Sequence, residues 1–343
     1  MHLALDQAKR GIGLTSPNPP VGAIIVQNDK VIGQGHHQKA GGPHAEIEAI
    51  QDAQRHFAKL LPGSTLYVTL EPCSSSGRTG PCTEAIKTSG IRRVVWGAND
   101  PNPHHQGRAR EILNIAGISV TSGVLQQECA DIIRPFSKWI RTGMPYVIAK
   151  AGQSLDGRIS RPPGEGVSIT SEAARAHARR LRPRVDAILV GAGTARADDP
   201  RLTIREGLNT QKRQPLRVIL SRSGNLSAEL RVLSDEHKDR TVVLHGPTLE
   251  EALRELGRRE VLTVLIEGGS EIFGQAFAEK LVDEVVWYIA PMICGSACLP
   301  SVGGNPLPHS VALENIKVLS VGETLCITGN PLWNPTPTPQ GQG

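Results

Sequence analysis

Apolar residues in the first third of the chain gather in short segments that alternate with stretches of helical spacing. Short runs bounded by turn residues are typical of buried strands. Such runs occupy 21–26, 31–35, 65–70, 93–97 and 118–120. Helical spacing follows Gly42-Pro43 and Pro81-Cys82 and returns over 107–116. This alternation predicts an α/β domain.

The rest of the chain repeats the alternation. Strands are predicted at 146–150, 187–190, 216–220, 241–244, 261–266 and 284–289, and helices at 171–181, 248–258 and 269–280. The segment 141–145, Arg-Thr-Gly-Met-Pro, interrupts an apolar helical stretch and predicts domains of 1–142 and 143–330. Residues 331–343 are rich in Pro, Thr, Gly and Gln, which predicts a disordered tail.

Bulk properties narrow the class of protein. A length of 343 residues suggests two domains. No apolar run approaches the roughly 18 residues needed to cross a bilayer, and Met1–Asp6 opens an amphipathic helix, so we expect a cytoplasmic protein without a membrane partner. The net charge is +5, but aromatic residues make up only 3% and no dense Lys/Arg block occurs, which argues against a nucleic-acid partner. The six cysteines show no disulfide spacing.

The most specific motif combines His44-Ala-Glu46 with Pro72-Cys73 and Pro81-Cys82. One imidazole and two thiolates can hold zinc and leave a tetrahedral position open for a water, with Glu46 as a nearby carboxylate that is not a ligand. The order matches the H-x-E…P-C-x-x-C signature of zinc deaminases, with eight residues rather than two between the cysteines. We expect His44 and Glu46 in the first turn of one helix and Cys82 at the start of another, where the helix dipole favours thiolate.

A structural zinc site, or a pair of buried cysteines without metal, is the alternative interpretation. A structural site closes its shell with a fourth Cys or His. His56 and the pair His104-His105 are the candidates for that ligand, but none lies beside the motif.

Glycine positions in the second half of the chain give a weaker indication of a cofactor site. Gly191-Ala-Gly193 lacks a full dinucleotide fingerprint, because Arg196 occupies the third glycine position. A buried strand that runs through Gly268-Gly269 into a helix N-terminus can cradle a phosphate, or can simply make a tight turn.

Further motifs occur in both halves. The first half contains Thr15-Ser-Pro-Asn-Pro-Pro-Val-Gly22, Pro43-His-Ala-Glu46, Glu71-Pro-Cys-Ser74, Gly77-Arg-Thr79 and Asp100-Pro-Asn-Pro103. The second half contains Lys150-Ala-Gly-Gln-Ser-Leu-Asp-Gly-Arg-Ile159, Asp186-Ala-Ile-Leu-Val-Gly-Ala-Gly-Thr194, Asp198-Asp-Pro-Arg-Leu-Thr-Ile-Arg205 and Glu267-Gly-Gly269. Through these motifs and their order, the chain resembles the bifunctional riboflavin-biosynthesis deaminase/reductase family over about residues 3 to 328.

The resemblance implies a cytidine-deaminase-like three-layer first domain and a dihydrofolate-reductase-like α/β second domain. It implies zinc-dependent deamination of 2,5-diamino-6-(5-phosphoribosylamino)pyrimidin-4-one and then NADPH-dependent reduction of the ribosyl chain to ribityl. The implied cofactors are one Zn²⁺ per chain and NADPH, and the partner is a phosphorylated pyrimidine. Whether the chain forms a homo-oligomer stays open.

Motif matching also implies residue roles. In the first domain Glu46 is the base and then the acid, and Asn18, Arg78, Asp100 and Asn102 bind substrate. In the second domain, cofactor positions are Gly152, Ser168, Thr194, Asp198, Gly269, Ser270 and Ile272. Substrate positions are Arg182, Leu202, Arg205 and Glu267, and Lys150 polarises the sugar while Glu267 orients it. Turn-forming asparagines, a solvated helix end at Arg182 and a strand-end salt bridge of Lys150 or Glu267 are the ordinary alternatives.

The chain departs from the family pattern at three places. Ser75 and Ser76 stand where a histidine is usual, and Ser221-Arg222 replaces a usual Asp-Ser. Ser168 replaces a Trp, and loss of that flat apolar surface predicts NADPH binding weaker by roughly 1 kcal/mol or more. Two other functions remain as alternatives: a single-function nucleoside or tRNA-base deaminase with an inactive second domain, and a non-enzymatic zinc-stabilised binding module.

Overall fold

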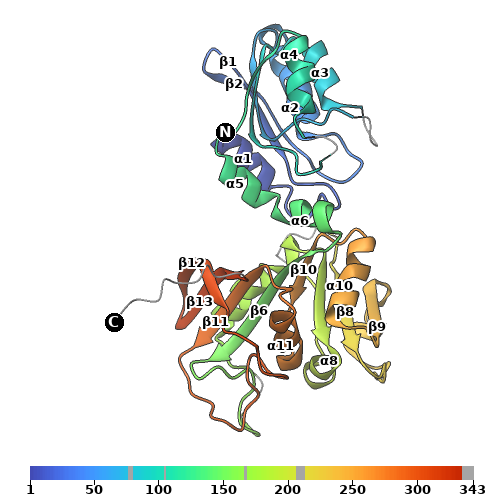
Figure 1. The fold of residues 1–343 in the computed structure, drawn as a ribbon, viewed down its shortest axis with the longest axis vertical. Coiled ribbons are helices and arrows are strands. Elements are labelled where there is room, and N and C mark those ends of the chain that lie inside the picture. The colour runs from blue at the N-terminus through green and yellow to red at the C-terminus, as the bar shows by residue number, and fades with distance from the viewer. Residues whose placement is uncertain (76–79, 104–105, 166–167, 206–212, 334–343) are drawn as a thin grey trace. The chain divides into compact units, whose positions relative to one another are not determined.

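A computed structural model describes residues 1–75, 80–103, 106–165, 168–205 and 213–333 (Figure 1). The chain divides into two compact units, Met1–Gly143 and Met144–Gly343. Within the described residues, no helix is long and apolar enough to span a membrane.

The first unit is built on one mixed sheet. Its strands, in the order β2-β1-β3-β4-β5, are β2 (Lys30–His36), β1 (Gly22–Gln27), β3 (Thr65–Leu70), β4 (Arg93–Ala98) and β5 (Ser119–Thr121). β1 is antiparallel to β2 and β3, whereas β3, β4 and β5 run parallel. The carboxyl ends of β3 and β4 therefore meet at the same edge of the sheet, where the loops that follow them lie together.

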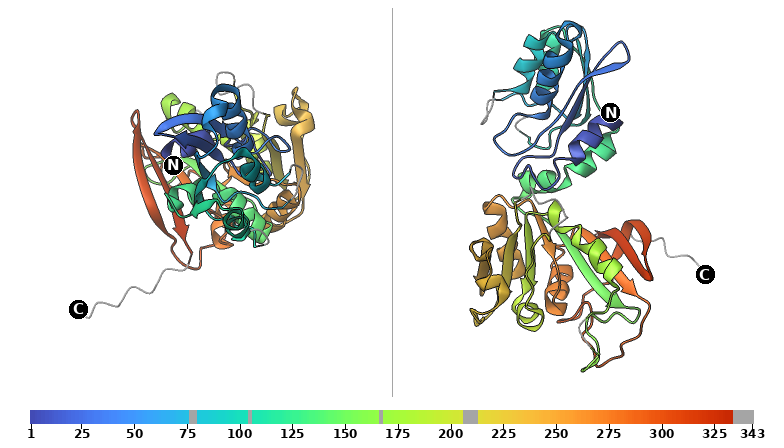
Figure 2. Two further views of the ribbon diagram at one scale, coloured as in Figure 1. Left: turned by 90° about the horizontal axis from the view of Figure 1, so that it is seen from above. Right: turned by 180° about the vertical axis from the view of Figure 1, so that it is seen from behind.

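Helices cover both faces of this sheet and make three layers (Figures 1 and 2). α1 (His2–Lys9) and α5 (Gln126–Ile132) lie together on one face. α2 (Ala45–Phe57), α3 (Cys82–Ser89) and α4 (Arg108–Ile115) lie on the other. The 3₁₀ turn η1 (Ala58–Leu60) follows α2, and α6 (Arg134–Thr142) ends the unit.

Close approach between α2 and β2 depends on glycine. A Cβ at Gly33 would lie 2.4 Å from the backbone oxygen of Ala49, and one at Gly35 would lie 2.5 Å from the nitrogen of Ala49. The small residues Ala45, Ala49 and Ala53 on the buried side of α2 complete this contact. Because α2 begins beside His44, this packing fixes the height of the motif above the sheet.

The second unit is a larger sheet in the order β12-β13-β11-β6-β10-β7-β8-β9. The strands are β6 (Tyr146–Ser154), β7 (Ala187–Gly191), β8 (Leu216–Ser221), β9 (Thr241–His245), β10 (Thr263–Ile266), β11 (Glu284–Ala290), β12 (Ala312–Val321) and β13 (Thr324–Leu332). β13 pairs antiparallel with β11 and with β12, and the other strand pairs are parallel.

Apolar cores lie on both faces of this sheet. α10 (Leu249–Arg258) and α11 (Ser270–Ala278) contribute to one core, and α7 (Glu172–Arg179), α8 (Ala192–Asp198) and α9 (Arg231–Ser234) to the other. The 3₁₀ turns η2 (Arg182–Arg184) and η3 (Lys238–Arg240) follow α7 and α9.

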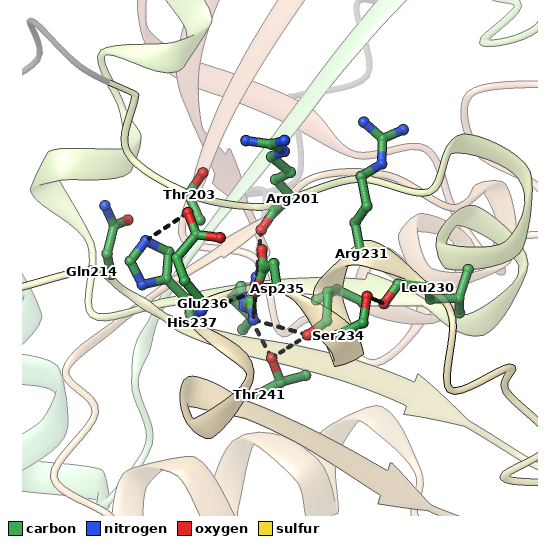
Figure 3. Close-up of polar contacts among 12 residues, drawn as sticks. Arg201, Thr203, Gln214, Leu230, Arg231, Ser234, Asp235, Glu236, His237 and Thr241 are labelled. Carbon is green, nitrogen blue, oxygen red and sulfur yellow. Dashed lines mark hydrogen bonds and ion pairs between the residues drawn. The ribbon is translucent and has the colours of Figure 1, made fainter.

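Arg217 in β8 is a buried cation, 1% exposed, that joins several segments. Its guanidinium forms a bidentate pair with Asp235, with both N···O distances 2.8 Å, and donates to the Thr241 hydroxyl at 2.9 Å. It also donates to the backbone carbonyls of Arg201 and Val232. Asp235, Thr241 and Arg201 are labelled in Figure 3. These bonds compensate the desolvation of the charge and fix the segment that contains Arg201.

The predicted elements are largely confirmed, with three differences. The first is the antiparallel hairpin of β12 and β13, which was not predicted. β12 is exposed along most of its length, including Val318 and Leu319 on opposite faces, so its sequence carries no alternating pattern. The second is the pair of short helices α8 and α9, neither of which was predicted.

The third difference concerns the tail. Disorder was predicted from residue 331, but β13 extends to Leu332 and Trp333 donates its indole N–H to the carbonyl of Val282 at 3.0 Å. The ring of Trp333 also packs against that of Phe277. Pairing with β12 and this aromatic contact explain the order of residues 331–333. The remaining residues of the predicted tail lie outside the described part of the chain.

Candidate functional site

His44, Cys73 and Cys82 come from three segments at one edge of the first sheet. His44 is the N-cap of α2, with extended backbone, so it precedes the helix rather than lying in its first turn as predicted. The His44 side chain does not cap the helix, so its imidazole is available to other groups. Cys73 follows the carboxyl end of β3, and Cys82 is the first residue of α3, as predicted.

The three side chains have the geometry of a zinc centre. The Nδ1 atom of His44 lies 3.3 Å from Sγ of Cys82 and 3.5 Å from Sγ of Cys73, and the three donor atoms lie within 4.8 Å of one another. Zinc–nitrogen and zinc–sulfur bonds in a tetrahedron place such donors about 3.6 Å apart. The donors therefore fit one zinc ion without rearrangement.

The ligand set contains three residues within the part of the chain that the structure describes. His56, a candidate fourth ligand, is exposed and lies 3.8 Å from Asp52 instead. The other candidates, His104 and His105, lie outside the described residues. A set of three is the arrangement that leaves one tetrahedral position for a water.

Hydrogen bonds favour the charged form of the sulfur ligand at Cys73. The backbone N–H of Cys82 donates to Sγ of Cys73 at 3.3 Å. Hydrogen bonds from the Cys82 and His44 side chains lower the pKa of the Cys73 thiol. Metal ligation requires the thiolate, so these contacts prepare the site for a cation.

Glu46 lies in the first turn of α2 beside this centre and is 3% exposed. Burial, with a smaller effect of the charge on Cys73, raises the pKa of Glu46 to about 7. A carboxyl group with a pKa near neutrality can both accept and release a proton at that pH.

Asn18 is held by a histidine that the sequence prediction missed. Nδ1 of His37 lies 2.8 Å from the carbonyl oxygen of Pro43, so Nδ1 is the donor and Nε2 accepts the amide N–H of Asn18 at 3.0 Å. This bond directs the NH₂ end of the Asn18 amide toward His37. The His37 ring also packs edge-on against that of His44, with centroids 5.3 Å apart. His37 follows β2 and only its proximity in the fold reveals the contact.

Asp100 and Asn102 lie on the loop after β4, close to the segment of Cys73 along the same sheet edge. The side chain of Asp100 accepts the backbone N–H of Asn102 at 2.9 Å, which is a turn of the kind expected for these residues. Arg78, predicted to meet the phosphate, lies outside the described residues.

In the second unit, Lys150, Glu267 and Arg182 form a charged cluster. Ile266 pairs with Ala149 in parallel register, which places Glu267, just after β10, near Lys150 of β6. Nε and Nη2 of Arg182 each lie 2.8 Å from a carboxylate oxygen of Glu267. Burial would raise the pKa of Glu267, but the charges of Arg182 and Lys150 outweigh it and lower that pKa to about 2.

Arg182 thus lies in this charged cluster rather than at a solvated helix end. Its Nη1 donates to the carbonyl of Thr203 at 2.8 Å, next to Leu202, whose φ is +51°. Burial and the charges of Arg179 and Arg182 lower the pKa of Arg205, so several cations gather around this segment. Arg179 and Arg182 already pair with the carboxylates of Glu172 and Glu267.

Several predicted cofactor residues meet where β7 and β10 lead into α8 and α11. Gly268 and Gly269 have φ values of +120° and +99°, a conformation that side chains disfavour. A Cβ on Gly269 would lie 3.2 Å from Ile272 and 3.5 Å from Thr194. Ser270, the first residue of α11, follows directly. The segment that leads into α11 therefore lies close to Thr194 of α8.

The other predicted cofactor positions lie in other segments of the second unit. Gly152 of β6 packs closely against Thr170: a Cβ on Gly152 would lie 3.0 Å from Cγ2 of Thr170. Ser168 is exposed in the same segment as Thr170. Burial raises the pKa of Asp198, the last residue of α8. Arg222, one of the departures from the family pattern, pairs at the surface with Glu271 at 2.7 Å.

Comparisons with known proteins agree with both halves. Residues 1–98 match the cytidine and deoxycytidylate deaminase zinc-binding region, and residues 145–327 match the RibD C-terminal domain. The riboflavin biosynthesis protein RibD of Aquifex aeolicus is 37% identical over 348 residues, which cover 95% of this chain and 96% of that protein.

Solved structures give the same result. The structure of Acinetobacter baumannii RibD matches with a TM-score of 0.88 at 34% identity, and covers 96% of this chain and 97% of its own. A Thermotoga maritima structure described as a diaminohydroxyphosphoribosylaminopyrimidine deaminase/5-amino-6-(5-phosphoribosylamino)uracil reductase matches with a TM-score of 0.85 at 34% identity, over 97% of each chain. The predicted two-domain α/β fold, deaminase-like and then reductase-like, is confirmed.

Removal of one sulfur ligand tests the metal centre. We expect Cys82→Ser to lower zinc affinity more than about 100-fold, beyond the loss typical of residues that only support a ligand. Zinc content after equilibration with a competing chelator measures the change. Cys294→Ser, at a free cysteine of the other unit, is the matched control and should retain zinc. Equal zinc content in the two variants would contradict the assignment.

Removal of Arg182 tests the buried ion pair. The pKa of Glu267 is lower in the folded protein than in the unfolded chain. Its ionised form therefore stabilises the fold at pH values above the ordinary carboxyl pKa, and this contribution is lost as the pH falls toward about 2. Arg182→Met leaves Glu267 buried beside Lys150 alone. We expect the free energy of unfolding at neutral pH to fall by up to about 3–5 kcal/mol. Urea unfolding measures it, with Arg222→Met at the exposed pair as control; comparable small effects in both variants would refute the prediction.

Proposed function

Because this chain belongs to the RibD family of bifunctional riboflavin-biosynthesis enzymes, we propose that its first domain is a zinc-dependent pyrimidine deaminase and its second an NADPH-dependent reductase. The proposed domain limits are 1–142 and 143–330. The proposed first substrate is 2,5-diamino-6-(5-phosphoribosylamino)pyrimidin-4-one, and the reduction converts its deaminated product to the ribityl form.

One observation carries the deaminase assignment. Three metal-ligand atoms lie at the separations that one zinc ion requires, and a buried carboxyl group that is not a ligand lies beside them. When bound, zinc supplies a Lewis acid that lowers the pKa of a water. His44, Cys73 and Cys82 are the proposed ligands.

Glu46 performs the proton transfers in this proposal. Its carboxylate takes a proton from the water that attacks the ring carbon bearing the exocyclic amine. The resulting acid donates that proton to the ring nitrogen. Glu46 then takes the proton of the newly added hydroxyl and passes it to the amine, which leaves as ammonia while the carbonyl forms. Burial of Glu46 supports both roles, because it keeps the pKa near neutrality and limits exchange with bulk water.

Substrate recognition in the first domain is assigned to loops around the metal centre. The His37 bond uses the NH₂ end of Asn18, so the Asn18 oxygen is the group proposed to accept an N–H of the pyrimidine. Asp100 and Asn102 are proposed to contact the same substrate from the loop after β4. Arg78 is proposed to bind the 5′-phosphate through its fork of donors.

The second domain is proposed to reduce C1′ of the ribose in its imine form. NADPH supplies the hydride when bound. Lys150 polarises the sugar end and Glu267 orients it, and the ion pair with Arg182 holds the Glu267 carboxylate in place. Arg182, Leu202 and Arg205 are proposed to line the substrate site, where the group of arginines suits an anionic phosphate.

NADPH is proposed to lie across the starts of α8 and α11. Gly269, Ser270, Ile272 and Thr194 form the cradle, where the two glycines allow the backbone to approach a phosphate. Gly152, Ser168 and Asp198 complete the proposed set. Ser168 offers less apolar surface than the usual Trp, so we expect the affinity for NADPH to be lower than in relatives with that Trp.

Membership of this enzyme family argues against a zinc-stabilised binding module without activity. It also argues against a single-function deaminase, since the match to the RibD C-terminal domain extends over residues 145–327.

Glu46→Gln separates chemistry from metal binding. We expect zinc to stay bound and ammonia release to fall by about 10²–10⁴-fold, because the amide cannot transfer the proton. Ammonia production and mass analysis of the pyrimidine product, for exchange of an amine by a carbonyl oxygen, measure the reaction. Glu48→Gln on the same helix is the control. Unchanged turnover in Glu46→Gln would remove the deaminase mechanism.

The reductase proposal is tested with the deaminated intermediate. Wild-type protein should oxidise NADPH only when this intermediate is present, and the product should gain two hydrogens by mass. Lys150→Ala should reduce the rate by about 10²-fold or more if the ammonium polarises the sugar. Deaminase activity of the same variant is the internal control for the first domain, and urea unfolding of the variant is the control for folding of the second. Full NADPH oxidation by Lys150→Ala would show that Lys150 has another role.

A further inference from the structure

Glu71 is a buried carboxylate to which neither proposed reaction gives a role. It directly follows β3, two residues before Cys73, and is 3% exposed. Its backbone N–H donates to the carbonyl of Ala98 at 2.9 Å, at the end of β4. Glu71 therefore lies between the segment of the proposed metal ligand and the loop that continues from β4.

The two carboxylate oxygens of Glu71 bind opposite ends of that loop. Oε2 accepts the backbone N–H of Asp100 at 3.3 Å, and Oε1 accepts that of Gly107 at 2.9 Å. The backbone N–H of Ala109 also bonds to this carboxylate. Gly107 is the N-cap of α4 and has no side chain to cap the helix. The Glu71 carboxylate, just after β3, thus accepts backbone N–H groups at the start of α4 that have no partner within the helix.

The loop is also braced internally. Asn102 donates its backbone N–H to the Asp100 side chain at 2.9 Å, and Gln106 donates its backbone N–H to the carbonyl of Asn102 at 3.2 Å. These bonds connect the described residues of the loop to one another. The bonds to Glu71 connect both ends of the loop to the segment of Cys73.

We propose that Glu71 is a positioning residue that holds Asp100 and Gly107 at a fixed place relative to the proposed metal ligands, and so keeps Asp100 and Asn102 in contact with the pyrimidine substrate. The inference rests on the proposed deaminase function. It assigns Glu71 no proton transfer and no contact with the metal. Its effect is on substrate affinity.

The chemistry of the carboxylate makes this role specific. Both oxygens act as acceptors, whereas the amide of glutamine has one acceptor and one donor. Glu71→Gln therefore turns an N–H toward one of the backbone N–H groups and releases one end of the loop. Glu71→Asp keeps both acceptors but shortens the side chain, so it should restore part of the affinity.

The test compares Glu71→Gln and Glu71→Asp with wild type, in the full-length zinc-loaded enzyme. For Glu71→Gln we expect the KM of the diaminopyrimidine nucleotide to rise about tenfold, with kcat within about twofold of wild type. This is the effect expected when a hydrogen bond to a charged acceptor is lost and that bond supports substrate binding but not the chemical step. Glu71→Asp should lie between Glu71→Gln and wild type. The matched control is Glu111→Gln, at an exposed carboxylate of α4, which should behave as wild type.

Two readouts separate positioning from a general structural role. Zinc content and reduction of the deaminated intermediate should stay at wild-type values in Glu71→Gln. Backbone hydrogen exchange should accelerate at Asp100 and Gly107 but not in β3. Unchanged KM and exchange would overturn the proposal, and so would loss of zinc or a fall in kcat alone. If Glu71→Gln does not fold, Glu71→Asp is judged by the same measurements.

The exchange measurement also separates this inference from the proposed function. If wild-type protein releases no ammonia, the deaminase proposal fails, whereas unaltered exchange in Glu71→Gln refutes the role of Glu71 as a clamp for the loop. Accelerated exchange with an unchanged KM would show that the loop does not bind substrate and would also overturn the proposal.

Discussion

The proposed function of the first domain depends on one nitrogen and two sulfur atoms that lie within 4.8 Å of one another, close enough to bind a single zinc ion. These atoms come from residues separated by up to 38 positions in the sequence. The N-cap of α2, the segment after β3 and the first residue of α3 each fix one of them. The glycines of β2 contribute indirectly, because they let α2 approach the sheet closely enough for His44 to reach the cysteines.

Burial has different consequences for the two carboxylates at the proposed reaction sites. At Glu46 desolvation prevails and the pKa rises to about 7, which suits a group that transfers protons. At Glu267 the charges of Arg182 and Lys150 prevail and the pKa falls to about 2, which keeps the group ionised. A permanently charged carboxylate orients other groups and does not donate protons at neutral pH. The neighbouring cations, rather than the depth of burial, decide which role each residue can have.

How strongly the local sequence pattern indicates an element explains which parts of the fold could be predicted. The strand at 65–70 was predicted to the residue, because β-branched, aromatic and other apolar side chains follow one another there between turn residues. The hairpin of β12 and β13 was missed, because exposed β12 has no apolar face to give the pattern. The His37–Asn18 bond and the contacts of Glu71 were missed for another reason: the partners lie 19 and up to 36 positions apart, and no spacing rule connects them.

The sequence by itself determined the ligand set, the two-domain α/β class and the family, because residue types, motif order and apolar periodicity are local properties of the chain. Only the tertiary structure decided that the ligand atoms are close enough for one ion, that Arg182 pairs with Glu267, and that Glu71 reaches both ends of the loop after β4. Distances of this kind depend on how helices pack on a sheet and on strand register, which are set by the whole core. The charge state of a buried group depends on the same neighbours, so it too could be derived only after the chain was folded.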